Sequence, residues 1–355
     1  DRSPSRGLGD VYKRQDHGFG NLRGFVNGVL RNIARNKDCI KFPDLENNIR
    51  EYFSVKYSVP TDLLDIFERD YDYDTIDKIL ASGDSDRPTA IRVNTEKISV
   101  DEFAEKLKKN DITVTRGMLN DTSLLISGYD YIRKIPGFFD GEFVVQDQSS
   151  CLAVKAASIQ NGDLVLDVCA APGGKTMYAA ALAGPDGIVI SRDLTERKTE
   201  LIEENIDRLG LKNVTVQVHD ARVCDDELVG KADVVIADLP CSGLGIIGRK
   251  NDIKYHVSMD SIKELAGLQR EILETACRYV KHGGTLVYST CTIDSLENDE
   301  NAKWFAETHD FSLCSIDEVI PEHGGEKGFV TLHQGIDECD GFLSLIHISE
   351  PTRRT

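Results

Sequence analysis

The sequence predicts an α/β protein whose larger part is an open, mainly parallel sheet with helices on both faces. From about residue 146, apolar runs typical of buried strands alternate with amphipathic helical segments, which is the pattern of a parallel sheet. Acidic residues then close successive strands, at Asp167, Asp193, Asp220 and Asp238. Because ligands of such sheets bind at the carboxyl ends of the strands, the fold also predicts where the site lies.

The first segment of the chain predicts a helix over 21–36. Its apolar residues share one helical face and favour a core helix with a solvated basic side. A phosphate contact by its arginines is the alternative. The apolar residues are Phe25, Val26, Val29, Leu30 and Ile33, and the arginines are Arg23, Arg31 and Arg35.

Further helices and a small α/β unit are predicted next. The stretch from about 45 to 83 has helical periodicity, including "TDLLDIFERDY" and "YDTIDKILASG". A strand is predicted over 87–95, a helix over 100–110, and strands over 111–117 and 123–127. We therefore divide the chain into a helical segment over 16–88, a small α/β subdomain over 89–145 and the main domain over 146–342.

Five strands form the predicted sheet of the main domain. They lie at 163–168, 187–193, 214–220, 232–238 and 285–290. The helix over 196–210 stops at Gly210, a residue suited to a helix C-terminus, and a long helix is predicted from about 260 to 281.

Composition excludes several classes of protein. The formal charge of −18 argues against sequence-blind adhesion to nucleic acid, which needs a basic surface. Nine cysteines without a CxxC pair favour neither a disulfide framework nor a zinc site, so we expect a reducing cytoplasm. No apolar stretch has the length of a membrane span, and no signal peptide is expected. The segments 1–15 and 343–355 resemble translated sequencing-adapter sequence, so we treat them as non-native tails outside the fold.

A glycine-bearing loop, "DVCAAPGGKT", follows the first strand of the sheet. Its small residues let a ligand approach the backbone just before a helix begins. It matches neither the GxGxxG dinucleotide pattern nor the P-loop, so ATP binding is disfavoured. A lone aspartate at a strand end is usually a helix N-cap. Four of them at successive strands fit a nucleoside ligand better, and a metal cluster is the weaker competitor because no histidine accompanies them.

Two cysteines follow the last two predicted strands, in "DLPCSG" and "YSTCT". A cysteine is usually a small apolar filler, which is our interpretation of Cys39, Cys151, Cys224, Cys277, Cys314 and Cys339. A thiolate at a ligand-binding edge, however, is a strong nucleophile. Cys241 and Cys291 are therefore candidates for catalysis.

These motifs, in this order, resemble the NOL1/NOP2/Sun family of RNA cytosine-5 methyltransferases, and within it the bacterial enzymes acting on 16S ribosomal RNA. Supporting stretches include "IRVN", "QDQSS", "GRKNDIKY" and "ENDENAKWF", so the resemblance covers roughly residues 20 to 342. Asn251 stands where a proline is usual, and Tyr255 stands for a common tryptophan. Both departures lie in a loop near the site.

The resemblance implies a Rossmann-like class I methyltransferase domain that uses S-adenosyl-L-methionine. Asp193 would hold the ribose of this donor, Asp220 its adenine side, and Asp238 would face the reacting centre. The loop residues that would wrap the donor are Cys169, Ala170, Ala171, Pro172, Gly173, Gly174 and Lys175.

The same resemblance implies that Cys291 is the nucleophile and that Cys241 helps to release the product. DNA cytosine-5 methyltransferases use the cysteine of the "PC" motif instead, so an exchange of the two roles stays open. Arg249, Lys250 and Lys254 would contact RNA phosphates, or would form a solvated loop.

The resemblance also sets the expected domains and function. Residues 16–88 would hold the last helix of a NusB-like RNA-binding domain with linker helices, 89–145 a small RNA-binding subdomain, and "DGF" at 340–342 the start of the last strand. We expect a cytoplasmic monomer, not bound to membranes, that methylates carbon 5 of a cytosine in 16S ribosomal RNA. The alternatives are the same chemistry on transfer RNA or 23S ribosomal RNA, and a non-catalytic RNA-binding assembly factor.

Overall fold

The computed structural model describes residues 22–39, 43–84, 87–316, 319 and 328–349. The chain divides into two compact units, Asp1–Lys56 and Tyr57–Thr355. The described part of the first unit contains α2 (Arg23–Asn36), the short 3-10 helix η2 (Lys37–Cys39) and most of α3 (Ile49–Tyr57). The expected tail over 1–15 lies outside the described residues.

The prediction of a core helix over 21–36 is half wrong. The helix is present as α2, but its apolar face is solvent-exposed: Phe25 is 71% exposed and Ile33 is 53% exposed. Val29 and Leu30 on the same face are exposed as well. Helical periodicity therefore located the element correctly, whereas burial depends on a partner surface that the pattern does not specify.

Two helices begin the second unit, and the end of the first one contacts a loop of the main sheet. They are α4 (Thr61–Asp70) and α5 (Tyr73–Ala81), followed by η3 (Ser82–Asp84). At the end of α4, Arg69 pairs with the buried Asp294 at 2.7 Å, and Asp70 accepts hydrogen bonds from Ser295. The Tyr71 hydroxyl donates to the carbonyl of Ile293 at 2.5 Å. These contacts fix the backbone directly after the "YSTCT" motif.

The predicted small α/β unit forms an antiparallel sheet in the order β2-β3-β1-β4. Its strands are β1 (Thr89–Val93), β2 (Thr113–Arg116), β3 (Ser123–Ser127) and β4 (Phe143–Val145), with α6 (Val100–Lys108) packed on one face and η4 (Ile132–Lys134) before β4. β4 is an addition to the elements that the sequence predicted. Ser99 and Glu102 form a capping box at the start of α6.

The predicted main sheet is confirmed, and it has eight strands among the described residues. The order is β10-β12-β9-β8-β5-β6-β7, with β11 paired to β12. Pairs from β7 across to β9 are parallel, and β12 runs antiparallel beside β9. The strands are β5 (Leu164–Asp167), β6 (Ile188–Asp193), β7 (Val214–Val218), β8 (Ala232–Asp238), β9 (Val280–Thr290), β10 (Phe311–Leu313), β11 (Phe329–Leu332) and β12 (Phe342–Ser349).

The order of the strands reverses between β5 and β8, because the chain runs outward from β5 through β6 to β7 and then returns to β8. A crevice at the carboxyl ends of β5 and β8 is thus the expected ligand site.

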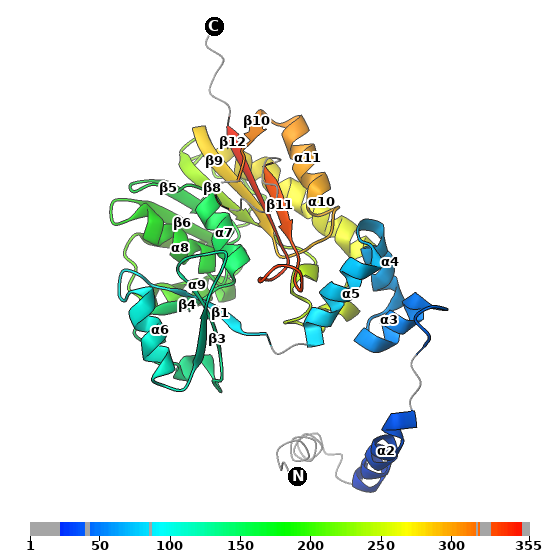
Figure 1. Cartoon of the computed structure of the whole chain (residues 1–355). Helices are drawn as coiled ribbons and strands as arrows, with labels where there is room; N and C mark the ends of the chain where they lie inside the picture. The colour runs from blue at the N-terminus through cyan, green and yellow to red at the C-terminus, as the bar shows by residue number, and fades with distance from the viewer. Residues whose placement is uncertain (1–21, 40–42, 85–86, 317–318, 320–327, 350–355) are drawn as a thin grey trace. The chain divides into compact units, whose positions relative to one another are not determined.

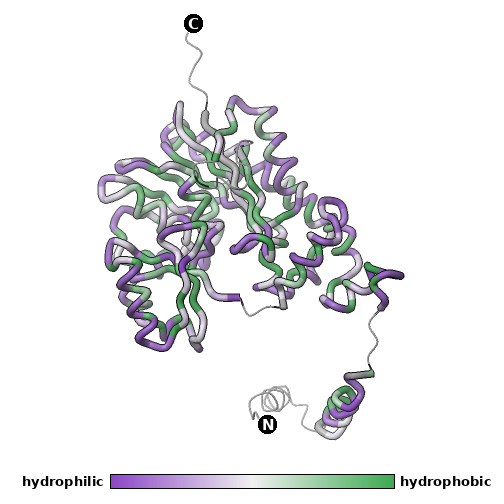
Figure 2. The backbone as a smooth tube through the Cα atoms, in the orientation of Figure 1, coloured by the Kyte–Doolittle hydropathy of each residue, from purple (hydrophilic) through white to green (hydrophobic). Residues whose placement is uncertain are grey.

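Helices cover both faces of this sheet (Figure 1). On one face, α7 (Gln148–Ala156) and α8 (Gly174–Ala183) share a core with Val165, Val234 and Val287. On the other, α10 (Met259–Ala276) and α11 (Asp299–Thr308) pack on Leu166, Val235 and Leu286. Alternate residues of each strand thus face opposite cores, and Figure 2 shows the strands as largely hydrophobic. The remaining elements are α9 (Glu196–Leu209) and the short η5 (Leu244–Ile246), η6 (Ile253–Tyr255) and η7 (Cys277–Tyr279).

Two predicted boundaries are wrong. The long helix α10 ends at Ala276, and Val280, which lies within the range predicted for this helix, begins β9 because it pairs with Ala232. The last strand starts at Phe342 as expected, but it continues to Ser349. Residues 343–349, which we excluded from the fold, therefore form most of β12. Among the described residues, no helix is long and apolar enough to cross a lipid bilayer.

Candidate active site

The loop after β5 carries the backbone from the sheet into α8. Gly173 precedes this helix with a φ of +101°, and a Cβ there would lie 2.8 Å from Met177 Cε. Only glycine adopts this conformation at low cost, which explains the first glycine of "PGG". The first N–H groups of α8 have no acceptor within the helix, and they face the end of the sheet.

A cavity of about 220 Å³ lies beside this loop. The cavity lies between the segment that connects β4 to α7 and the carboxyl ends of β5 and β8. Of the residues predicted to bind the donor, Cys169, Ala170, Ala171, Pro172, Gly174, Lys175 and Asp238 line it; its other lining residues are Val145, Gln146, Asp147, Ser150 and Asp167.

Asp167, at the end of β5, is fully buried. Its Oδ2 accepts a hydrogen bond from Thr176 at 2.7 Å, while Oδ1 has no hydrogen-bond partner among the described residues. Burial raises the pKa of this carboxyl to about 7, against the stabilising bond from Thr176. A buried acceptor without a partner is costly, so Oδ1 is suited to receive a donor group from a ligand.

Asp238, at the end of β8, is held from two sides. Lys175 Nζ lies 2.6 Å from its Oδ2, and Ser289 Oγ donates to its Oδ1 at 2.8 Å. Lys175 is only 8% exposed, whereas the side chain of Asp238 is 32% exposed, toward the cavity. The carboxylate therefore has a fixed position between the cavity and the two cysteines.

The two cysteines predicted to be catalytic face each other. Cys241 Sγ lies 3.3 Å from Cys291 Sγ, although the residues are 50 positions apart in the sequence. Both side chains are partly buried and neither forms a disulfide. A hydrogen bond between the two sulfur atoms makes one thiol the donor and the other the acceptor, so their pKa values differ.

The pKa values of the two thiols move in opposite directions. The hydrogen bond from Cys241 holds the pKa of Cys291 below its ordinary value, and the positive charges of Lys175 and Lys250 act in the same direction. The contact with Cys291, together with burial, raises the pKa of Cys241 well above its ordinary value. Cys291 is thus the favoured thiolate and Cys241 the favoured thiol.

A buried polar network that the sequence analysis missed supports the "PCSG" loop. Ser242 Oγ donates to Glu297 at 2.5 Å and contacts Thr292 Oγ1 at 2.7 Å. Gln269 donates to Glu297 and to the carbonyl of Pro240. Burial raises the pKa of Glu297, and bonds from Ser242 oppose this shift. Glu297 begins the stretch "ENDENAKWF", which was noted only as part of the family resemblance.

Asp193 and Asp220 lie outside the lining of the cavity. Asp193 accepts hydrogen bonds from the backbone of Ala171 and Leu194 and pairs with Lys198, so it shapes the loop as well as ending β6. Asp220 follows β7 by two residues, and its hydrogen bond and ion pair with Arg222 lower its pKa to about 2. Within the described part of the chain, no group of three or more His, Cys, Asp or Glu side chains has the arrangement of a metal site.

Two of the three basic residues after "PCSG" form contacts with other residues of the protein. Arg249 pairs with Asp340 at 2.7 Å, and Lys254 donates to the carbonyl of Tyr57 at 2.9 Å. Lys250 is exposed and lies close enough to Cys291 to affect its pKa. Of the other cysteines, Cys151 and Cys339 are buried as expected of apolar filler, whereas Cys39 is exposed.

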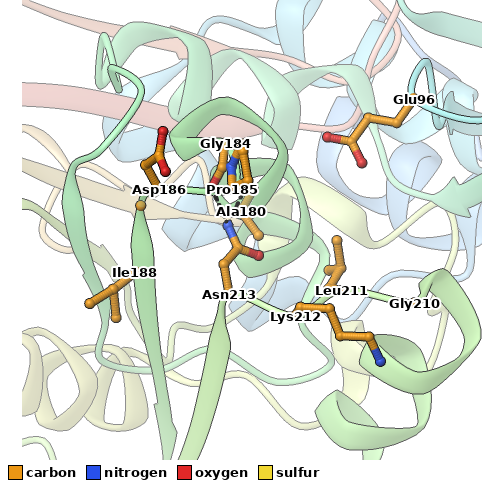
Figure 3. A pocket seen from close by; sticks show the side chains of 11 residues that line it. Glu96, Ala180, Gly184, Pro185, Asp186, Ile188, Gly210, Leu211, Lys212 and Asn213 are labelled. Carbon is orange, nitrogen blue, oxygen red and sulfur yellow. Dashed lines mark hydrogen bonds between the residues drawn. The ribbon is translucent and has the colours of Figure 1, made fainter.

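A larger cavity, of about 460 Å³, lies at the other end of the parallel strands, by the amino ends of β6 and β7 (Figure 3). Asn213 there donates to the carbonyls of Ala180 and Gly184, so this amide has its partners within the protein. No residue of the thiol site lines this cavity. Volume alone thus does not locate the chemistry in this fold.

Comparisons with known proteins agree with this fold. The family described as 16S rRNA methyltransferase RsmB/F matches residues 154–344, and the RsmF/B-like ferredoxin-like domain matches residues 59–130. A crystal structure of a methyltransferase homolog from Pyrococcus horikoshii has a TM-score of 0.73 at 26% identity, covering 84% of this chain and 97% of that one. The fold and site thus define an S-adenosylmethionine-dependent methyltransferase, and the expected cofactor is confirmed.

Curated relatives identify the family within this class of methyltransferases. A probable ribosomal RNA small subunit methyltransferase B from Bacillus subtilis is 37% identical over 309 residues, 86% of this chain and 68% of the relative. The ribosomal RNA small subunit methyltransferase B of Vibrio cholerae is 34% identical over 304 residues, 84% of this chain and 68% of the relative. The chain belongs to the RsmB/F family of RNA methyltransferases, so the family resemblance inferred from its motifs is confirmed.

Proposed function

We propose that this chain methylates carbon 5 of a cytosine in 16S ribosomal RNA through a covalent cysteine adduct at carbon 6. The observation that carries the proposal is the pair of thiols 3.3 Å apart beside the ion pair of Asp238 and the buried Lys175. The substrate follows from the relatives, which are named for the RNA of the small ribosomal subunit.

Cys291 is proposed as the nucleophile. Carbon 5 of cytosine is too weakly nucleophilic to take a methyl group directly. The thiolate of Cys291 forms a bond from sulfur to carbon 6, and the electron pair of the 5,6 double bond makes carbon 5 nucleophilic, which is covalent catalysis. The lowered pKa of Cys291 supports this assignment over the exchanged one, because the attacking group must be a thiolate.

Asp238 and Lys175 are proposed to stabilise the adduct. When sulfur adds to carbon 6, negative charge moves onto the ring, where the ammonium group of Lys175 offsets it, while the exocyclic amine on the same edge of the base stays a hydrogen-bond donor. A carboxylate held by Lys175 and Ser289 is already oriented for a hydrogen bond to that edge of the base and pays no reorganisation at the moment of reaction.

Cys241 is proposed to assist release of the product. A water molecule takes the proton from carbon 5, and the electron pair left behind restores the double bond and expels Cys291 sulfur from carbon 6 as a thiolate. Cys241 keeps its proton at neutral pH because its pKa is raised, and it lies in contact with the leaving sulfur. A thiol in that position protonates or hydrogen-bonds the departing thiolate.

The residues that line the cavity beside α8 support the proposal that the methionine end of the cofactor enters it. Gly173 and the small residues around it leave the backbone open to a ligand, and Asp167 supplies a buried acceptor without a partner among the described residues. The loop 169–175 and Asp238 would hold the cofactor, with Asp193 and Asp220 proposed for its ribose and adenine sides. When bound, S-adenosylmethionine supplies an electrophilic methyl group.

The proposal is tested by methyl transfer from labelled S-adenosylmethionine to unmethylated small-subunit RNA. We expect 5-methylcytidine in digested 16S RNA, identified by nucleoside mass spectrometry, and none with Cys291→Ala. Cys151→Ala is the matched control, because this buried cysteine lies outside the site. Transfer only to 23S RNA or transfer RNA refutes the substrate, and normal turnover by Cys291→Ala refutes the nucleophile. Cofactor binding without transfer to any RNA identifies a non-catalytic assembly factor.

A further inference from the structure

Gln146 carries a buried hydrogen-bond donor that no described residue uses. It lies between β4 and α7, is 5% exposed and lines the cofactor cavity. Its Nε2 has no partner among the described residues, although its Oε1 does. Such a donor costs free energy in the free protein, so it calls for a ligand acceptor or another explanation.

The orientation of this amide is fixed by Arg92. Arg92 Nε donates to Gln146 Oε1 at 2.8 Å, and a guanidinium can only donate. Turning the amide over would place two donors against each other, so Nε2 must face away from Arg92. Arg92 is itself buried and stacks on the ring of Tyr178, with 4.4 Å from its carbon Cζ to the ring centre.

The start of α8, beside Gln146, favours an anion, while Asp147, Asp167 and Asp238 line other parts of the cavity. A Cβ on Gly174 would lie 3.7 Å from Gln146 Nε2, so the amide sits against the first residue of α8. This helix has ten residues, and the free N–H groups of its first turn favour a negative charge. The helix terminus and the unpartnered amide are two independent features at one place.

The same cavity holds the unpartnered Asp167 Oδ1. One buried acceptor and one buried donor in a single cavity match the two ends of an α-amino acid, its ammonium and its carboxylate. The methionine portion of S-adenosylmethionine carries both groups. The ring of a cytosine offers no such pair of opposite full charges.

We propose that Gln146 binds the carboxylate of the methionine portion of S-adenosylmethionine through Nε2, and that Arg92 is the positioning residue that holds this amide in place. The inference rests on the cofactor of the proposed function and not on its covalent step. A failure of the cysteine mechanism therefore leaves it standing, and its own failure leaves that mechanism untouched.

The test is calorimetric binding of three ligands that share the nucleoside. S-adenosylhomocysteine has both amino-acid charges, its decarboxylated analogue keeps only the amine, and methylthioadenosine has neither. Gln146→Leu should weaken S-adenosylhomocysteine roughly tenfold or more, since a hydrogen bond to a charged group is lost. The other two ligands should bind as they do to the unchanged protein.

A matched control comes from a second pair of the same kind. Arg192 Nε donates to Gln217 Oε1 at 2.7 Å, away from the cavity lining, so Gln217→Leu should leave all three affinities unchanged. Gln146→Glu keeps the bond to Arg92 and replaces the donor by an acceptor. It should weaken S-adenosylhomocysteine more than Gln146→Leu does, and it should not weaken the decarboxylated analogue.

Three results overturn the proposal. Equal weakening of all three ligands by Gln146→Leu shows a change of cavity shape. Weakening of the decarboxylated analogue as well shows that Gln146 serves the amine. Unchanged binding of S-adenosylhomocysteine with slower methylation of RNA assigns Gln146 to the target base instead.

The role of Arg92 has its own signature. Arg92→Met should lower the affinity for S-adenosylhomocysteine relative to methylthioadenosine, and this selective loss should nearly vanish when Gln146 is already Leu. A purely structural role predicts instead that the two substitutions add, and that both ligands weaken together.

Discussion

At the residue scale, the chemistry depends on which of two touching thiols holds the proton. The same contact lowers the pKa of Cys291 and raises that of Cys241. Burial and the negative charge of Asp238 act against a thiolate at Cys291, whereas Lys175 and Lys250 favour it. The negative charge of Glu297 disfavours a thiolate at Cys241. The proposed roles of attacker and helper thus rest on the different surroundings of the two thiols.

This asymmetry predicts the pH dependence of alkylation. The pKa of Cys291 is depressed, so the reactive thiolate forms as pH rises through a midpoint below the ordinary cysteine value of 9.0. In Cys241→Ala the stabilising hydrogen bond is lost, and the midpoint should move to higher pH. Rates of iodoacetamide labelling, followed by mass spectrometry of the peptide containing Cys291, give both midpoints. Faster labelling of Cys241 than of Cys291 contradicts the assignment.

At the element scale, strand pairing brings the site together. β8 and β9 are parallel neighbours in a register that places Asp238 beside Ser289. Cys241 lies three residues beyond Asp238, and Cys291 lies two residues beyond Ser289. A shift of one residue in this register would turn the side chains of one strand to the opposite face and separate the thiols.

The glycine before α8 predicts how a side chain at that position changes stability and cofactor binding. Gly173→Ala puts a side chain at a positive φ, so it should destabilise the protein by about 1–2 kcal/mol and weaken binding of S-adenosylhomocysteine. Gly267→Ala is the control. It lies in open space on α10 and should instead stabilise the protein by up to about 1 kcal/mol without changing binding. Urea unfolding measures the stability, and calorimetry measures the binding of S-adenosylhomocysteine. If Gly173→Ala changes neither quantity, the proposed role of Gly173 in the cofactor loop is refuted.

At the scale of the whole molecule, the sequence predicted what depends on local pattern. The five parallel strands, the stop of α9 at Gly210 and the polar strand ends follow from periodicity and from residues with special backbone preferences. The partner of Asp238, the Ser242–Glu297 network and the Arg92–Gln146 pair did not follow, because each joins segments whose distance is set by strand order. The exposure of α2 and the extent of β12 likewise depend on neighbouring surfaces.

The central claim is that Cys291 sulfur bonds to the target base, and trapping that bond tests it most directly. Cys241→Ala, mixed with S-adenosylmethionine and unmethylated 16S RNA, should accumulate a protein–RNA species that survives denaturation. Peptide mass spectrometry should place the modified nucleotide on Cys291, and Cys241→Ala combined with Cys291→Ala should give no such species. A nucleotide found on another residue, or an adduct that persists in the double variant, would contradict the account.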